Sequence, residues 1–163
     1  MRVVCPYVEP KLHPLTLAAL QKYAPDADLV DLGLAWDAYY LFLAQLWDEG
    51  EGFLIVEEDI ELHEDVLPQL EACSQPWCVF PFPGAGGALL YGSLGCTRFS
   101  TELIAAVPDL MSKLPVRDWK RLDSEILPSL IRHGYEQHIH EPPVPHHHYR
   151  PERRLCDCGM PKH

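Results

Sequence analysis

Apolar and polar positions along the first half of the chain fall into blocks that predict strand, helix, strand, helix and strand in turn. Valine- and leucine-rich runs at 2–8 and 27–32 predict strands, and Pro14 and Pro25 bound the helix expected between them. The run 53–56 has no polar alternation, which is typical of a central parallel strand covered on both faces. This order predicts an α/β fold with a single doubly wound, mostly parallel sheet.

The clearest predicted element is a helix before residue 50 whose large side chains recur at i, i+3, i+4, i+7 and i+11. This spacing places them on one broad face, which we expect to pack on the sheet. The stripe consists of Trp36, Tyr39, Tyr40, Leu43 and Trp47.

The second half of the chain is less regular. Strands are predicted over 77–82, 88–96 and 135–140. Ser100 is expected to cap a helix that runs through Val107. A later helix is expected to begin at Asp123 or Ser124, close before Pro128, because proline is tolerated only in the first turn.

Composition and charge narrow the function classes. The chain has 163 residues, 47% of them hydrophobic, as expected for one compact soluble domain. No apolar run approaches the roughly 20 residues of a membrane span, and the first residues do not resemble a signal peptide. A net charge of −11 disfavours nucleic acid as a partner without excluding a local basic groove. Six cysteines without a disulfide-scaffold pattern favour reduced thiols and a cytoplasmic location.

Three adjacent carboxylates follow the central strand directly. Glu57, Glu58 and Asp59 repel one another unless a cation or solvent relieves them, and oxygen ligands of this kind suit Mn²⁺ or Mg²⁺. If the strand alternation persists, Glu57 and Asp59 point to one side and Glu58 to the other. The alternative is a solvated charged turn.

Histidines gather near the end of the chain. In an extended segment His138 and His140 share one face, as do His146 and His148, so either pair is able to ligate a metal. If this segment folds back over the strand edges, one imidazole would meet the acidic group. Surface histidines are the alternative. Cys156-Asp157-Cys158 with His163 lacks zinc-site spacing and is interpreted as a frayed end.

Five segments, in their order, resemble a nucleotide-sugar glycosyltransferase of the GT-A type in reduced form. They are VVCPYV, FLIVEEDIELH, LGCTRFS, WKRLD and HEPPVPHHH. The resemblance implies a reduced GT-A-like (Rossmann-like) catalytic domain over 1–150 and a C-terminal tail over 151–163. In that family an Asp-x-Asp sequence holds a divalent cation, usually Mn²⁺. Here it reads Glu57-Glu58-Asp59, which makes Asp59 the safer ligand, with a later histidine, His146 or His148, completing the metal shell.

The resemblance also implies residues that contact the nucleotide sugar. Base, ribose and phosphate contacts are expected from Pro6, Tyr7, Val8, Asp31, Glu58, Arg98 and Arg150. Arginine matches phosphate oxygens bidentately, although both arginines are also compatible with an ordinary surface position.

In inverting members of that family, a carboxylate base lies beneath the acceptor hydroxyl near the start of a late helix. Asp123 occupies that place here, with Asp118 second. Asp123 is alternatively a simple helix cap. Trp119 is expected either to stack on an acceptor ring or to pack in the core.

The sequence thus predicts a metal-dependent glycosyltransferase that moves a sugar from a nucleoside-diphosphate sugar to an acceptor hydroxyl, the acceptor itself being unspecified. The alternative is a non-catalytic nucleotide-sugar-binding module of the same fold that acts with a larger partner. A metal-dependent phosphoesterase is a third interpretation, but it would need more histidine and aspartate ligands on the early strands than the sequence offers.

Overall fold

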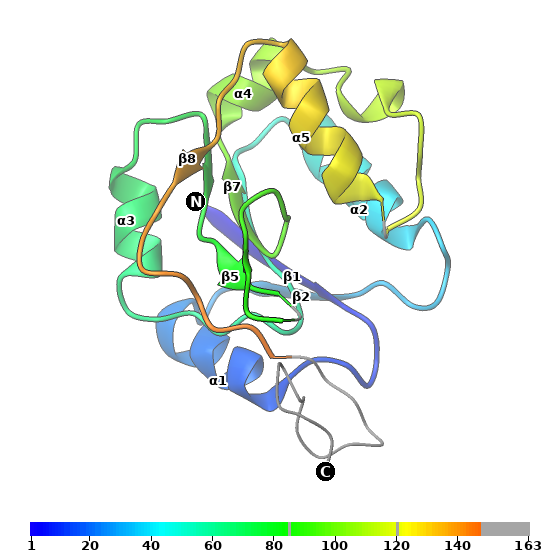
Figure 1. Cartoon of the computed structure of the whole chain (residues 1–163). Helices are drawn as coiled ribbons and strands as arrows, with labels where there is room; N and C mark the ends of the chain where they lie inside the picture. Colours follow the sequence, from blue (N-terminus) through cyan, green and yellow to red (C-terminus); the bar gives the residue numbers. More distant parts are fainter. Residues whose placement is uncertain (85, 120, 148–163) are drawn as a thin grey trace.

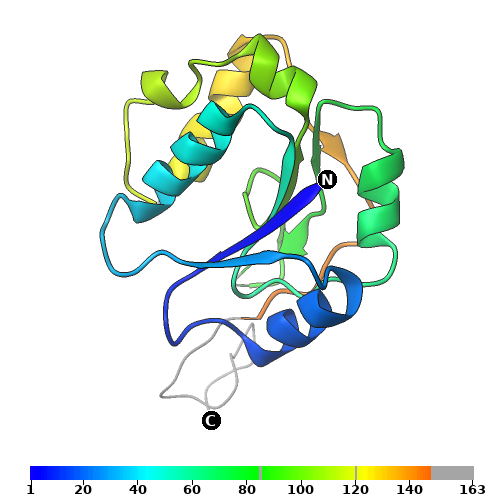
Figure 2. The same cartoon turned by 180° about the vertical axis from the view of Figure 1, so that it is seen from behind.

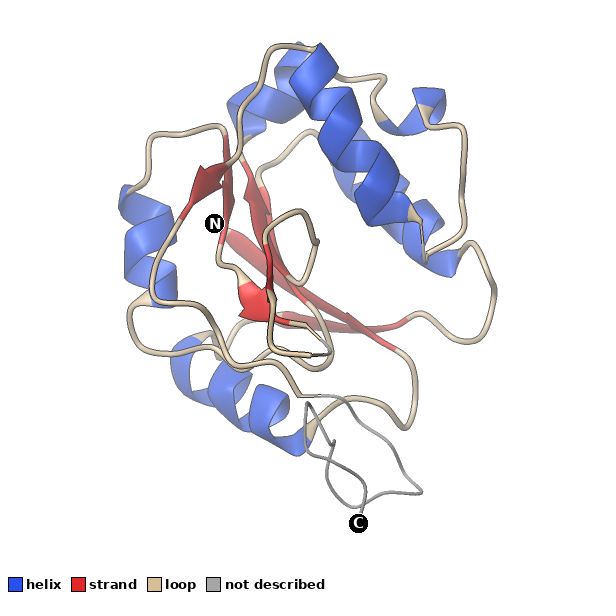
Figure 3. Ribbon diagram, in the orientation of Figure 1, coloured by secondary structure: helices blue, strands red, loops and turns tan. Residues whose placement is uncertain are grey.

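The computed structural model describes residues 1–84, 86–119 and 121–147. Its centre is a six-stranded sheet in the order β2-β1-β3-β7-β4-β8 (Figures 1 and 3). The strands are β1 (Arg2–Tyr7), β2 (Asp28–Asp31), β3 (Phe53–Val56), β4 (Trp77–Val79), β7 (Cys96–Phe99) and β8 (His138–Ile139). Only β7 runs antiparallel to its neighbours in this sheet. The predicted fold class, α/β around a mostly parallel sheet, is confirmed.

Helices cover both faces of the sheet, as in a doubly wound fold (Figures 1 and 2). The helices are α1 (Pro14–Tyr23), α2 (Ala38–Glu49), α3 (Val66–Ala72), α4 (Thr101–Ala106) and α5 (Leu122–Arg132), with a 3₁₀ turn η1 (Met111–Lys113). Alternate residues of β3 enter two separate cores. Phe53 and Ile55 pack with α2, α4 and α5, whereas Leu54 and Val56 pack with α1 and α3. The unbroken apolar run of β3 is therefore explained, as predicted, by burial on both faces of the sheet.

Most of the predicted stripe on α2 packs on the sheet. Tyr40, Leu43 and Trp47 are buried, and the Trp47 indole donates a hydrogen bond to the Val107 carbonyl at 2.9 Å. Trp36 does not belong to the stripe, because the helix begins only at Ala38 and leaves this ring 62% exposed.

Several predicted boundaries in the second half were wrong. Helix α5 begins at Leu122 and contains Pro128 well past its first turn, and Asp123 is a first-turn residue, not the cap. The structure also contains α3, which the sequence analysis did not predict. The expected strands 77–82 and 88–96 contribute a separate antiparallel pair, β5 (Phe82–Pro83) and β6 (Leu89–Leu90).

The chain after β8 returns across the sheet edge at which β1 and β3 end. The Val144 amide donates to the Pro81 carbonyl at 2.9 Å, and the Glu61 amide donates to the Pro145 carbonyl at 3.0 Å. Ile60 and His146 form an antiparallel bridge. The histidine segment is thereby held against the acidic one. Within the described residues, no helix combines the length and apolar character needed to cross a membrane.

Candidate functional site

The acidic segment forms a turn at the carboxyl end of β3. The strand ends at Val56, and the Ile60 amide closes the turn on the Glu57 carbonyl at 3.1 Å. The predicted strand alternation therefore does not persist, and Glu57, Glu58 and Asp59 all line one pocket of ≈ 230 Å³. The end of β1 and residues near the start of α2 line the same pocket. This is the position in which open α/β sheets bind ligands.

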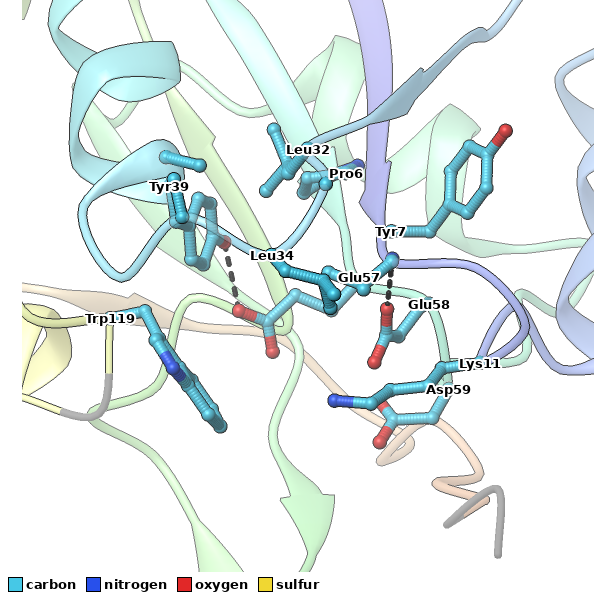
Figure 4. A pocket seen from close by; sticks show the side chains of 14 residues that line it. Pro6, Tyr7, Lys11, Leu32, Leu34, Tyr39, Glu57, Glu58, Asp59 and Trp119 are labelled. Atoms are coloured by element: carbon cyan, nitrogen blue, oxygen red, sulfur yellow. Dashed lines mark hydrogen bonds between the residues drawn. The ribbon is translucent and has the colours of Figure 1, made fainter. Parts of the chain in front are cut away.

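Each of the three carboxylates has a different partner, and Figure 4 shows those of Glu57 and Glu58. The Tyr39 hydroxyl donates to Glu57 at 2.8 Å, and the Val8 amide donates to Glu58 at 2.8 Å. Asp59 Oδ2 lies 3.1 Å from His146 Nε2. The turn thus directs three acidic side chains to three separate places around one pocket.

Burial and mutual repulsion oppose ionisation in this group. Burial, followed by the charges of Asp123 and Asp59, raises the pKa of Glu57 well above its ordinary value. Burial also raises the pKa of Asp123, although hydrogen bonds from the Ser93 hydroxyl and the Leu94 amide oppose that rise. Glu57 and Asp123 therefore resist ionisation where they lie, and a nearby bound cation would relieve that cost.

His146 is held between two hydrogen-bond acceptors. Its Nδ1 lies 2.9 Å from the Pro83 carbonyl and its Nε2 lies 3.1 Å from Asp59 Oδ2. Both contacts are hydrogen bonds only if both ring nitrogens carry protons, because an ionised carboxylate and a carbonyl have no proton to donate. Burial lowers the pKa of His146, but the bond to Asp59 and its charge outweigh burial and raise it. The contact with Asp59 therefore favours the protonated form of His146.

The neighbouring histidine strengthens the same contact between the two segments. His147 Nε2 lies 2.7 Å from Glu61 Oε2, and its ring stacks on His13 with centroids 4.6 Å apart. The His147 amide donates to the Asp59 carbonyl at 2.6 Å.

Some of the nucleotide-contact residues predicted from the sequence line the pocket, and others do not. Pro6, Tyr7 and Val8 line the pocket together with Glu58. Asp31 is exposed beside it, and its carboxylate accepts the Gly33 amide at 3.0 Å.

Arg98 lies away from this pocket. Its guanidinium donates to the Cys73 and Gln75 carbonyls at 3.3 and 3.0 Å. Arg150 and His148 lie outside the described residues.

The residues predicted near the acceptor are also separated. Trp119 lines the pocket on the side of Glu57 (Figure 4). Asp123 is close enough to Glu57 to perturb its pKa but is not among the described lining residues. Asp118 is partly buried before α5, and its carbonyl accepts the Arg121 amide at 2.9 Å.

Among the pocket residues that sequence reasoning missed, two are polar. Lys11 is the one cationic side chain among the described lining residues. Burial raises the pKa of Glu58, and the Val8 amide and the Lys11 charge oppose that rise. Lys11 follows the carboxyl end of β1, a position that is itself a signal for a ligand contact. The sequence analysis assigned Tyr39 only to packing, yet its hydroxyl donates a hydrogen bond to Glu57.

The acidic turn offers oxygen ligands of the kind that hard divalent cations prefer. Carboxylate oxygens such as those of Asp59 and Glu57 suit Mn²⁺ or Mg²⁺. Among the described residues, however, Glu57, Asp59 and His146 do not bring their ligand atoms within 4.8 Å of one another, so side chains would have to move for all three to hold one ion. Metal ligation would require His146 to give up the proton that faces Asp59.

Comparisons with known proteins concern the fold. No family model matches the chain, and no curated protein matches it. The crystal structure of A197 from STIV is similar, with 13% identity, a TM-score of 0.54 and coverage of 94% of this chain and 88% of that one. A glycosyltransferase involved in the glycosylation of the major capsid of PBCV-1 has 11% identity, a TM-score of 0.49 and coverage of 86% and 81%. At such identity the A197 similarity establishes the fold alone, and we base nothing on the second.

Proposed function

We propose that the protein transfers a sugar from a nucleoside-diphosphate sugar to an acceptor hydroxyl in the pocket at the end of β3, with Mn²⁺ or Mg²⁺ as cofactor. The observation that carries the proposal is the contact between Asp59 and His146 beside that pocket, across 87 positions of the sequence. A simple solvated acidic turn does not explain why the His146 side chain, only 8% exposed, is held against Asp59.

The pocket offers separate surfaces for the parts of such a donor. Pro6, Leu32 and Leu34 supply apolar contacts suited to a base and ribose (Figure 4). Lys11 supplies a positive charge near the carboxylates. A diphosphate is anionic, so in a chain of net charge −11 it needs this local compensation.

Asp59 and His146 would hold the metal, with Glu57 as a further oxygen ligand. The bound ion would neutralise the departing nucleoside diphosphate. His148 and Arg150 remain proposed contacts to the metal and phosphates. We do not retain Arg98 among the phosphate contacts, because its guanidinium serves the Cys73 and Gln75 carbonyls.

Asp123 is the proposed base, with Asp118 second. Burial holds the Asp123 pKa above its ordinary value, which brings it closer to the range useful for accepting a proton at neutral pH. Trp119, exposed at the mouth of the pocket, would stack on an acceptor ring.

Calorimetry with UDP and GDP sugars, with and without Mn²⁺, tests this function. We expect metal-dependent binding and slow donor hydrolysis by the wild type. Asp59→Ala should abolish the metal-dependent part of binding while leaving the fold intact. Asp48→Asn, which removes an exposed carboxylate on α2, is the matched control and should bind as the wild type does.

Binding without any turnover would overturn the proposed transfer and favour a nucleotide-sugar-binding module. Unchanged metal-dependent binding by Asp59→Ala would overturn the site.

A further inference from the structure

A second group of metal-binding side chains lies outside the acidic pocket. Cys73, Cys78 and His140 each offer a ligand atom, and these atoms lie within 4.8 Å of one another. Cys73 is the residue after α3, Cys78 is in the middle of β4, and His140 follows β8. Pairing of β4 with β8 and a hydrogen bond from the His140 amide to the Val79 carbonyl at 2.9 Å fix these elements together.

The orientation of His140 leaves one ring nitrogen available. The Gln69 amide nitrogen donates to the Glu141 carbonyl at 2.9 Å, so the Gln69 Oε1 is the atom that faces His140 Nδ1, at 3.2 Å. Nδ1 must then carry the proton, which leaves a lone pair on Nε2. Within the described part of the chain, Nε2 is buried and has no hydrogen-bond partner. A buried acceptor without a donor is costly unless a ligand occupies it.

The two thiols supply the remaining donors. Their sulfur atoms are 3.2 Å apart, and the Arg98 guanidinium lies 3.4 Å from Cys78 Sγ. Burial and Cys73 raise the pKa of Cys78 to about 12, and the nearby Arg98 cation opposes that rise.

We propose that Cys73, Cys78 and His140 bind Zn²⁺. Two thiolates and a neutral imidazole form a soft donor set that selects zinc over Mn²⁺ or Mg²⁺. Binding replaces two thiol protons, which are released to solvent, and the zinc with its two thiolates and neutral imidazole is then uncharged. A hollow of ≈ 370 Å³ lined by Cys73, His138 and His140 adjoins the cluster, so water or the exposed His138 would complete the coordination.

Binding requires one local adjustment. Two sulfurs on a tetrahedral zinc with Zn–S bonds of about 2.3 Å are about 3.8 Å apart, so the pair must open slightly. Cys73 is only partly buried and lies outside regular structure, so its side chain is the one that moves. The ion would tie the end of α3 to β4 and to the start of the segment that carries His146.

Binding of Co²⁺ in place of Zn²⁺ tests the site, because its absorption spectrum reports directly on thiolate ligands. The background is the full chain with Cys156→Ser and Cys158→Ser, so that those two thiols cannot contribute. Under reducing conditions we expect one equivalent of Co²⁺ to give a thiolate-to-cobalt charge-transfer band that Zn²⁺ abolishes. Cys73→Ser and His140→Gln should each weaken zinc binding more than the roughly 10–100-fold expected for loss of the supporting Gln69 in Gln69→Ala.

Two controls separate this site from other thiols and from the acidic pocket. Cys5→Ser removes a buried thiol outside the cluster, and Asp59→Asn changes the acidic pocket. Both should retain the band with unchanged affinity.

Absence of the band in the reduced background chain would overturn the proposal, as would a band that persists in Cys73→Ser and His140→Gln. Isolation of the chain with a Cys73–Cys78 disulfide, together with no zinc uptake after reduction, would also overturn it in favour of a redox pair.

Discussion

Replacement of Glu57 by glutamine should stabilise the metal-free protein. The change keeps the shape of the side chain and an oxygen that accepts the Tyr39 hydroxyl, now at 2.8 Å. It removes a charge that burial, Asp123 and Asp59 all disfavour. Relief of such a functional-site charge is worth about 0.5–2 kcal/mol. For a chain of this size, each 1 kcal/mol raises the melting temperature by about 2–4 °C.

Thermal unfolding in the presence of a chelator measures this effect. Glu51→Gln is the matched control because Glu51 is exposed, and its change should stay within about 0.5 kcal/mol. Equal melting temperatures for the two variants, or a lower one for Glu57→Gln, would refute the electrostatic reasoning.

The stability gain of Glu57→Gln should also depend on pH and should be larger at higher pH. The Glu57 carboxyl has a pKa in the folded chain above its ordinary value of 4.5, so the folded state binds this proton more tightly than the unfolded state. Wild-type stability therefore falls as pH rises from 4.5 through the folded pKa. The advantage of Glu57→Gln should be full above that folded pKa and should disappear as pH falls below 4.5.

Three further changes probe the surroundings of the pocket. His146→Ala leaves Asp59 without its imidazole and should cost about 1.5–3 kcal/mol in urea unfolding without metal; a cost near zero would mean that the contact does not hold the two segments together. Gly95→Ala places a Cβ 2.3 Å from the buried Phe82 ring, and the overpacking should cost about 1–3 kcal/mol, so a stability equal to wild type would show that the ring moves freely. Ser100→Ala removes the side-chain cap of α4 and should cost about 1 kcal/mol by the same assay, with no change in Mn²⁺ binding.

The central strand β3 was predictable because burial on both faces of the sheet requires a continuous apolar run without polar alternation. The run 53–56 is β3 without a shift of boundary, and Ser100 caps α4 as expected. The fold class followed from the order of such blocks. Helix α5 was misjudged because a single proline was treated as a boundary, whereas the helix accommodates Pro128 internally.

The site was only partly predictable, since its components come from distant segments. The acidic turn stands out locally, but the approach of His146 to Asp59 depends on the path of the chain after β8. The hydrogen bond from Tyr39 to Glu57 could not be predicted, because Tyr39 belongs to the apolar stripe of α2 that packs on the sheet. Arg98 could not be placed from its residue type, because nothing local distinguishes a phosphate contact from a guanidinium that serves backbone carbonyls.

Anomalous diffraction from crystals grown with Mn²⁺ and a nucleoside diphosphate is the most direct test of the cation site at the end of β3. The account predicts a manganese peak within about 2.5 Å of the Asp59 carboxylate, with His146 turned to the ion and the diphosphate beside Lys11. An intact bond between Asp59 and His146, with no manganese in the pocket and the nucleotide absent or elsewhere, would contradict it.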